Sequence, residues 1–443
     1  SADVALTAYA LKFLVEAADV IEVDRDVIRQ ARQWLIKQQR SDGSWAPQQS
    51  AVTSETEHHR HALLTAYVAR ILAATEAKLI SEATESAIPE ERAALAESLK
   101  RAVAYIGQLS NKIDEPYLLA SYALTLIELR DVARAKPVIE KLRSLVQRDG
   151  ASAYWPIESN TPFYGWGRAG RIETTALVVQ ALSRYCKLPE GNCTDYSELV
   201  KQGLMFLLDN KDENGVWHST QATINVLDTM LEFFAAHKAG READAGSAAQ
   251  IEINGRVVQT VTIPETRRFV TRISIPITTF LSAGKNRIEI KRPAGGIFSS
   301  VQALANYYVP WMEKPSRVST GLRLVTTFDK TEAQVGDSIT CHVEIERAGS
   351  NGFGMLLAEV GLPPGAEVDR NSLEAALKTS ISQYEVLPDR VVLYVWPRSG
   401  AVIFDFKLRP RFGMAAKTAA SVLYDYYNPD SRVVLPPVKF RVK

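Results

Sequence analysis

Residues 1–240 place apolar side chains at the spacing of amphipathic helices, and one segment of this pattern returns. Residues 34–45, Trp-Leu-Ile-Lys-Gln-Gln-Arg-Ser-Asp-Gly-Ser-Trp, align with residues 206–217, Phe-Leu-Leu-Asp-Asn-Lys-Asp-Glu-Asn-Gly-Val-Trp. Each copy has the pattern of an apolar helix end, a glycine that can take the left-handed conformation, and a tryptophan that folds back. The recurrence predicts a repeat of helical hairpins.

The helices that open the repeats also share a pattern, because each is expected to begin with small residues. The five openings are Leu6-Thr7-Ala8-Tyr9, Leu64-Thr65-Ala66-Tyr67, Leu119-Ala120-Ser121-Tyr122, Glu173-Thr174-Thr175-Ala176 and Thr220-Gln221-Ala222-Thr223. Small residues let neighbouring inner helices approach closely. Five hairpins in sequence predict an α/α toroid, and the indoles of Trp45 and Trp217 are expected to be buried against the helices that follow them.

The pattern changes near residue 240. Residues 237–247 are small and polar, as in a linker, and alternation with a period of two follows. It predicts strands at 251–253, 257–263, 269–277 and 286–290, with Asn254-Gly255 as a tight hairpin turn. This small β domain is expected to be the least stable part of the chain.

A second β domain is expected from about residue 316. Its predicted strands are 322–328, 338–346, 355–360, 391–396, 401–408 and 419–426. Residues 370–378 are predicted to be its single helix, with Asn371 or Ser372 as the N-cap. The fold class is therefore multi-domain, α then β: a toroid, a small β domain and a β-sandwich.

Composition and net charge bear on which classes of function to expect. The net charge of +1 gives no reason to expect binding to nucleic acid or to an anionic membrane. No apolar run reaches the roughly 18 residues of a membrane-spanning helix. The three cysteines form no metal or redox motif, and no cofactor is expected; Cys186 and Cys193 are close enough for a local disulfide, but idle thiols explain them equally well.

Two peptides resemble the α2-macroglobulin and complement thioester-protein family. Gly215-Val216-Trp217-His218-Ser219-Thr220-Gln221-Ala222-Thr223 is similar to the family's Gly-x-aromatic-x-Ser-Thr-Gln-x-Thr segment, and Val422-Leu423-Tyr424-Asp425-Tyr426-Tyr427 to its Val-Tyr-Asp-Tyr-Tyr strand. The resemblance assigns residues 1–240 to a thioester-type toroid, 249–313 to part of a CUB domain, and 316–443 to the receptor-binding, macroglobulin-like sandwich.

The resemblance implies a non-enzymatic protease trap, in which cleavage of a bait segment releases a thioester that acylates the protease. The family's Cys-Gly-Glu-Gln motif does not occur in this sequence. The resemblance places the motif on a sixth hairpin upstream of Ser1, so the chain is either a truncated member or a relative without a thioester. Target proteases and upstream macroglobulin domains are the implied partners. The implied location is extracellular or periplasmic, with membrane anchoring through an upstream segment left open.

Site residues follow from the same resemblance. Tyr426 and Tyr427 are the candidates to shield the thioester, although they could equally fill the sandwich core. Some complement members carry an acyl-transfer histidine in the loop after the first tryptophan, but residues 46–57 contain none. His58 and His59 follow that loop. With His61, Glu55 and Glu57 nearby they could also form a metal cluster or a solvated helix start.

The receptor-binding helix of the family carries two lysines, and Asp369 and Leu373 stand at the comparable positions. This departure favours a bacterial member with a role in defence. Two other classes stay open. A terpene cyclase or prenyltransferase toroid would need acidic residues facing its cavity, for which Asp114-Glu115 is the one acidic pair at a helix opening. A structural or adhesive secreted module is the second alternative.

Overall fold

The computed structural model describes most of the chain. The described residues are 3–47, 55–81, 89–110, 112–189, 191, 193–212, 215–236, 248–262, 273–291, 303–305, 321–348, 354–396 and 400–443. Two compact units result: Ser1–Val226 together with Asn306–Lys443, and Leu227–Ala305. Each unit is described by itself.

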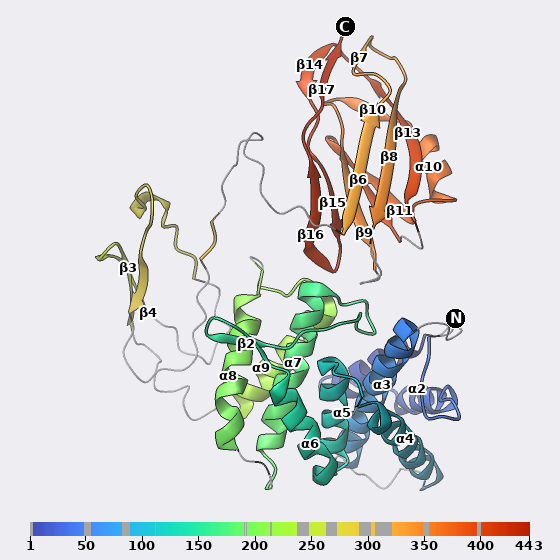
Figure 1. Ribbon diagram of the computed structural model, residues 1–443, viewed down its shortest axis with the longest axis vertical. Helices are drawn as coiled ribbons and strands as arrows, with labels where there is room; N and C mark the ends of the chain where they lie inside the picture. The colour runs from blue at the N-terminus through green and yellow to red at the C-terminus, as the bar shows by residue number, and fades with distance from the viewer. Residues whose placement is uncertain are drawn as a thin grey trace. The chain divides into compact units, whose positions relative to one another are not determined.

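Helices dominate the first half of the chain (Figure 1). Within the described residues they are α1 Val4–Ala17, α2 Arg25–Lys37, α3 Glu55–Ser81, α4 Pro89–Ser110, α5 Pro116–Glu128, α6 Val132–Ser144, α7 Gly167–Cys186, α8 Cys193–Asp209 and α9 Thr220–Ala236. Helices α1, α3, α5 and α7 pack side by side as an inner layer, and each packs against the helix that follows it. Four complete hairpins and a fifth inner helix, α9, therefore form the described part of the predicted repeat.

Three tryptophans close the repeats in the same way. Each indole nitrogen donates a hydrogen bond to the carbonyl of a leucine two residues before the end of the preceding outer helix. Carbonyls in the last turn of a helix lack the N–H partner four residues further on. Those of Leu35 and Leu142 also accept the N–H of the C-cap residue three positions on. The pairs are Trp45 with Leu35 (2.8 Å), Trp155 with Leu142 (2.7 Å) and Trp217 with Leu207.

The same tryptophans are fixed to an inner helix through their backbone. Each main-chain N–H donates to a threonine hydroxyl on the inner helix that follows; the threonines are Thr65, Thr175 and Thr223. The exposed fractions of Trp45, Trp155 and Trp217 are 0, 0 and 3 %. The predicted burial of Trp45 and Trp217 is thus confirmed, and Trp155 is a third copy that the sequence pattern had not identified.

The expected helix starts were wrong for α3 and α7. These helices begin at Glu55 and Gly167, well before the small-residue segments at Leu64 and Glu173. The small-residue segments lie inside the helices, and their threonines bind the tryptophans. Small residues thus mark the place where an inner helix contacts a tryptophan, and the helix extends toward its N-terminus from there.

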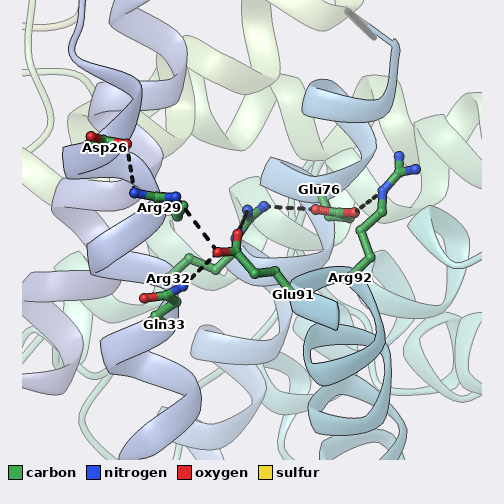
Figure 2. A network of polar contacts seen from close by, with 7 residues as sticks. All are labelled: Asp26, Arg29, Arg32, Gln33, Glu76, Glu91 and Arg92. Carbon is green, nitrogen blue, oxygen red and sulfur yellow. Dashed lines mark hydrogen bonds and ion pairs between the residues drawn. The ribbon is translucent and has the colours of Figure 1, made fainter. Parts of the chain in front are cut away.

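A network of polar contacts joins the helices of the first two hairpins (Figure 2). Arg32 of α2 pairs with Glu76 of α3 at 2.9 Å and lies 3.9 Å from Glu91 of α4. Gln33 donates to Glu91 at 2.8 Å, and Arg92 reaches Glu76 at 3.6 Å. Because Arg32, Glu76 and Glu91 are all less than one-fifth exposed, these contacts are less screened than surface ion pairs. They fix α2 against both α3 and α4.

The second unit contains a three-stranded sheet in the order β4-β3-β5. Its strands are β3 Ala248–Ile253, β4 Arg256–Thr262 and β5 Ile288–Lys291. Asn254 and Gly255 both have positive φ, so the predicted tight turn is confirmed. A strand over residues 269–277 was also expected; residues 269–272 lie outside the described chain, and 273–277 contain no strand.

One face of this sheet is apolar. Ile251 pairs with Ile290 and Ile253 with Ile288, so the four side chains share a face. The opposite face carries the Lys291–Glu252 ion pair at 2.7 Å. Ile288 and Ile290 are 41 and 40 % exposed. Within the described residues, this apolar face is therefore only partly covered.

The sandwich is formed by residues 321–443. Its strands are β6 Leu322–Phe328, β7 Glu332–Ala333, β8 Ile339–Arg347, β9 Leu356–Gly361, β10 Ala366–Val368, β11 Gln383–Val386, β12 Arg390–Val395, β13 Val402–Pro410, β14 Met414–Lys417, β15 Ser421–Asp425, β16 Asn428–Leu435 and β17 Lys439–Val442. Sheets β10-β13-β8-β6 and β11-β12-β9-β15-β16 enclose the core, and β14-β17-β7 form a third. All six predicted strands are present.

The helix of the sandwich is α10, Arg370–Leu377, and its predicted cap was wrong. Asp369 is the N-cap, and its carboxylate accepts a hydrogen bond from the backbone N–H of Asn371 at 3.1 Å. Aspartate at this position also interacts favourably with the positive end of the helix. Across the described residues, every helix is too short or too polar to cross a bilayer.

The tryptophan arrangement generates a stability prediction. Trp155→Ala should lower the free energy of unfolding by about 3–5 kcal/mol, because it removes a fully buried aromatic side chain. Trp155→Phe keeps most of the apolar volume but removes the indole hydrogen bond to the Leu142 carbonyl, which keeps the Leu145 N–H at 3.2 Å, so a loss of roughly 0.5–1.5 kcal/mol is expected. Urea unfolding measures both. Phe13→Ala, at a position 58 % exposed, is the control and should change stability by about 0.5 kcal/mol or less; equal losses for Trp155→Ala and Phe13→Ala would contradict the proposed role.

The second unit generates a prediction about amide exchange. Backbone amides of β3, β4 and β5 should exchange faster than those around Leu177 of α7, because a small sheet with one partly covered apolar face is marginally stable. Hydrogen exchange followed by mass spectrometry on the chain measures both regions together. Protection of the three strands as strong as that of α7 would show that this sheet is stable in this chain.

Candidate functional site

Residues 155–166, which connect β2 (Ser152–Tyr154) to α7, form a loop rich in aromatic side chains, here called the aromatic loop. Its tip is a tight turn. The Tyr164 N–H donates to the Thr161 carbonyl, the Thr161 N–H to the Gly165 carbonyl, and the Gly165 N–H to the Thr161 hydroxyl, each at 2.9 Å. Tyr164 has φ of +64°. A tyrosine in the left-handed region is strained, so the surrounding contacts must hold it there.

The two rings at the tip make different contacts. Phe163 packs edge-on against Tyr9 of α1 and Tyr67 of α3, with ring centroids 5.9 and 5.4 Å apart. Tyr164 packs edge-on against Trp396 at 5.3 Å and is stacked with Tyr427 at 6.3 Å. The loop therefore connects two inner-layer helices, α1 and α3, to the sandwich within the same unit.

The sequence-predicted Tyr426 and Tyr427 lie in the turn between β15 and β16. Their rings touch edge-on at 5.2 Å, and Tyr426 is 44 % exposed. Tyr427 stacks with Tyr164 of the aromatic loop, and burial raises the pKa of its phenol. Neither ring belongs to the buried sandwich core. Their role in shielding stays a prediction.

A buried carboxylate holds this turn. Asp425 accepts hydrogen bonds from the backbone N–H groups of Tyr427 at 2.9 Å and Asn428 at 3.2 Å. Its other oxygen is 2.7 Å from Arg347 of β8, and Asp425 is 1 % exposed. The aspartate between the tyrosines in the sequence motif is therefore the residue that positions them.

The N-terminus of α7 lies beside the same turn. The Arg168 N–H donates to the Asn428 side-chain oxygen at 3.4 Å, and the Arg168 guanidinium is 3.9 Å from Asp430. A Cβ atom at Gly167, which has φ of +53°, would lie 2.3 Å from the Asn428 side chain. Glycine is required there for both conformation and close approach.

Two buried carboxyl groups lie under the aromatic loop. Burial is the main cause that raises the pKa of Glu173, on α7, to about 8, against the lowering effect of the Thr161 and Ser219 hydroxyls and of Arg70. Burial likewise raises the pKa of Glu115 to about 7, although the carboxyl accepts the backbone N–H of Glu158 at 3.0 Å. Both groups can exchange protons near neutral pH.

The remaining candidates lie elsewhere. His58 and His59 fall in the first turns of α3, where His58 is exposed and His59 half-buried. His61 is buried in the same helix. The side chains of Glu55 and Glu57 are outside the described part of the chain, and the described residues contain no group of side chains arranged for a metal ion. An acyl-transfer role for His58 or His59 therefore stays a prediction.

The acidic pair expected of an isoprenoid enzyme has structural roles. Asp114 is exposed and pairs with Lys141 at 2.7 Å. Glu115 is the buried N-cap of α5. The Cys186–Cys193 pairing stays a prediction, because the Cys193 side chain lies outside the described residues.

Sequence reasoning missed Tyr164, Trp396 and the burial of Glu115 and Glu173. A faint signal existed for Glu173, because an acidic residue followed by Thr174, Thr175 and Ala176 interrupts the apolar pattern of an inner helix. Burial of a carboxyl in such a helix marks a candidate functional position. For Tyr164, residues 161–165 predict only a turn.

Two family models match the chain. The A-macroglobulin TED domain matches residues 1–233, and the A-macroglobulin receptor binding domain matches residues 351–435. Complement C3 of Oncorhynchus mykiss is 24 % identical over an alignment 447 residues long, which covers 96 % of this chain and 25 % of that relative.

Solved structures agree on the fold. The native conformation of E. coli α2-macroglobulin matches with 15 % identity and a TM-score of 0.55, covering 100 % of this chain and 25 % of that one. Salmonella α2-macroglobulin reacted with methylamine matches with 16 % identity and a TM-score of 0.54, covering 100 % and 26 %. The chain thus spans about a quarter of the length of these relatives.

The buried carboxyls generate a prediction about pH. Glu115 binds a proton in the folded chain between its ordinary pKa of 4.5 and about 7, where the unfolded chain has released it. The free energy of unfolding should therefore fall as pH rises through this window. Glu115→Gln should remove on the order of 2–3 kcal/mol of the decline between pH 5 and pH 8, measured by urea unfolding at both values.

Glu97→Gln is the matched control, since the Glu97 side chain is 58 % exposed on α4. It should leave the pH dependence of the wild-type chain unchanged. An identical decline in the wild-type chain and in Glu115→Gln would refute the assignment of this proton to Glu115.

Proposed function

Because this chain belongs to the A-macroglobulin and complement family of thioester-domain proteins, we propose that it is the C-terminal portion of a protease trap of the α2-macroglobulin type. In the whole protein, a protease cleaves an upstream bait segment and releases the toroid from the sandwich. An upstream thioester then acylates an amine or hydroxyl of that protease. The chain itself catalyses no reaction; it supplies scaffold and shield, outside the cell or in the periplasm.

We propose domain boundaries at 1–240 for the thioester-type toroid, 249–313 for a CUB-type domain and 316–443 for the receptor-binding sandwich. The matched family segments, 1–233 and 351–435, support the first and the last. The amphipathic β4-β3-β5 sheet supports the second, because its partly covered apolar face suits a sandwich completed by further strands. Upstream macroglobulin domains are the proposed source of those strands.

The observation that carries the proposal is the packing of Tyr164 against Trp396 and Tyr427. An acyl donor such as a thioester survives only where water is excluded. Aromatic rings from the toroid and from the sandwich meet at this junction and can exclude water on both sides. Tyr427 is the proposed direct shield, and Tyr426 supports it through their edge contact.

An apolar stripe on α1 supports the position proposed for the thioester hairpin. Leu6 and Phe13 are 59 and 58 % exposed and stand seven residues apart on one side of the helix. A stripe of this kind normally packs against another helix. An upstream hairpin lying along α1 would bury it and extend the inner layer.

The proposal predicts different behaviour for two lengths of the protein. The chain of 443 residues alone should not incorporate radiolabelled methylamine and should not inhibit trypsin-like proteases, because it contains no Cys-Gly-Glu-Gln. The protein extended upstream to include the bait and thioester segments should do both, and its methylamine incorporation should accelerate after protease treatment.

Variants of the extended protein test the shield. Tyr427→Ala should raise methylamine incorporation before protease treatment about tenfold, whereas Phe412→Ala, at a position 52 % exposed on the sandwich, should leave it unchanged. An extended protein without a thioester, or one whose resting reactivity is the same in Tyr427→Ala and wild type, would contradict the proposed mechanism.

A further inference from the structure

We propose that the aromatic loop is a pH-sensitive latch. One buried carboxyl group, Glu173, holds it in place while it carries a proton, and loss of that proton loosens the loop together with Phe163 and Tyr164. This inference rests on contacts of the loop within the toroid. It stands whether or not the whole protein traps proteases.

The Glu173 side chain packs directly against the turn at the loop tip. A Cβ atom at Gly165 would lie 2.4 Å from the Glu173 Oε1 atom and 2.6 Å from the Thr161 hydroxyl, so the carboxyl and the turn are in direct contact. Glu173 is 2 % exposed, and Oε1 has no hydrogen-bond partner among the described residues. A protonated carboxyl fits this site, whereas an ionised one would leave a buried charge without sufficient donors.

The groups around Glu173 do not supply a matching charge. Arg70 of α3 is the one cation that acts on it, and the two side chains form no ion pair within 4 Å. Arg70 also interacts with Tyr117 of α5 and lies 5.5 Å from the centre of the Tyr67 ring. Two hydroxyls also lie at the Glu173 carboxyl: that of Thr161, on the loop, and that of Ser219, just before α9. The Glu173 carboxyl also interacts electrostatically with Tyr427 of the sandwich. The three tyrosines are neutral near pH 7, so the Thr161 and Ser219 hydroxyls and Arg70 oppose the effect of burial on the pKa of Glu173, and burial outweighs them.

Glu115 is hydrogen-bonded to the N-terminal half of the loop. Its Oε2 accepts the backbone N–H of Glu158 at 3.0 Å, and its Oε1 caps α5 through the N–H of Tyr117 at 3.5 Å. The Ser159 N–H also acts on the carboxyl, and the Glu158 side chain is the nearby like charge that opposes its ionisation. Glu115 therefore connects the loop to an inner helix.

Strain at the tip provides the tendency to open. Tyr164 is held at φ of +64° by the turn hydrogen bonds and by the Asn160 side chain, which donates to the Tyr164 carbonyl at 3.0 Å. A non-glycine residue leaves this conformation when its restraints weaken. Because the Glu173 carboxyl contacts the turn itself, a negative charge on Glu173 would act directly on the turn that holds Tyr164 in this conformation.

The pH window follows from Glu173. Its pKa is raised above the ordinary 4.5, to about 8. A raised carboxyl pKa means that the folded loop is favoured at low pH and loses this stabilisation as pH rises through the folded-state value. The latch should therefore be closed at pH 6 and loosened at pH 9.

Native-state hydrogen exchange tests the latch in the whole chain. After correction for the intrinsic pH dependence of exchange, protection of residues 155–166 should fall at least about tenfold between pH 6 and pH 9, while peptides of α5 stay unchanged. In Glu173→Gln, protection should stay high across this range. Glu97→Gln, at an exposed position on α4, should behave as wild type.

A second variant keeps the test decisive if Glu173→Gln does not fold. Arg70→Gln removes the cation that favours ionised Glu173, so the midpoint of the transition should move to higher pH; loss of a merely structural side chain would lower protection equally at every pH. Protection in wild type that does not change with pH, or a midpoint unmoved in Arg70→Gln, would overturn the proposal.

Discussion

The helical half of this protein depends on one repeated arrangement, in which a tryptophan is bound at both ends. Its indole N–H satisfies a carbonyl in the last turn of an outer helix, and its backbone N–H binds a threonine on the next inner helix. One residue thus ends one hairpin and positions the next. Because the indole is buried, the two hydrogen bonds are formed away from competing water and leave little freedom in the angle between successive hairpins.

This arrangement explains why the architecture could be predicted from the sequence. The glycine and tryptophan at the end of an outer helix, and the threonine among small residues of an inner helix, lie in short segments that can be recognised. The strands of the sandwich were equally accessible, since β8 and β13 alternate buried and exposed residues along their length. Helix starts were less accessible, because α3 and α7 extend beyond the segments that define the repeat.

The candidate site was predicted less well, and the reason is physical. Tyr427 could be named because its motif is recognisable, but its partner Tyr164 lies in a loop whose residues specify only a turn. Glu115 and Glu173 lie in helices far apart in the sequence, and each becomes unusual only when the aromatic loop covers it. Burial depends on tertiary packing, so only a faint sequence signal marks Glu173 and none marks the burial of Glu115.

The buried pair of Asp425 and Arg347 has a further consequence for the β15–β16 turn. The turn is ordered by a carboxylate anchored in the sandwich, independently of anything that touches its tip. A surface that is already ordered loses little conformational entropy when a partner binds it. The sandwich can therefore lose and regain a contact at Tyr427 as a rigid body, with no refolding of its own.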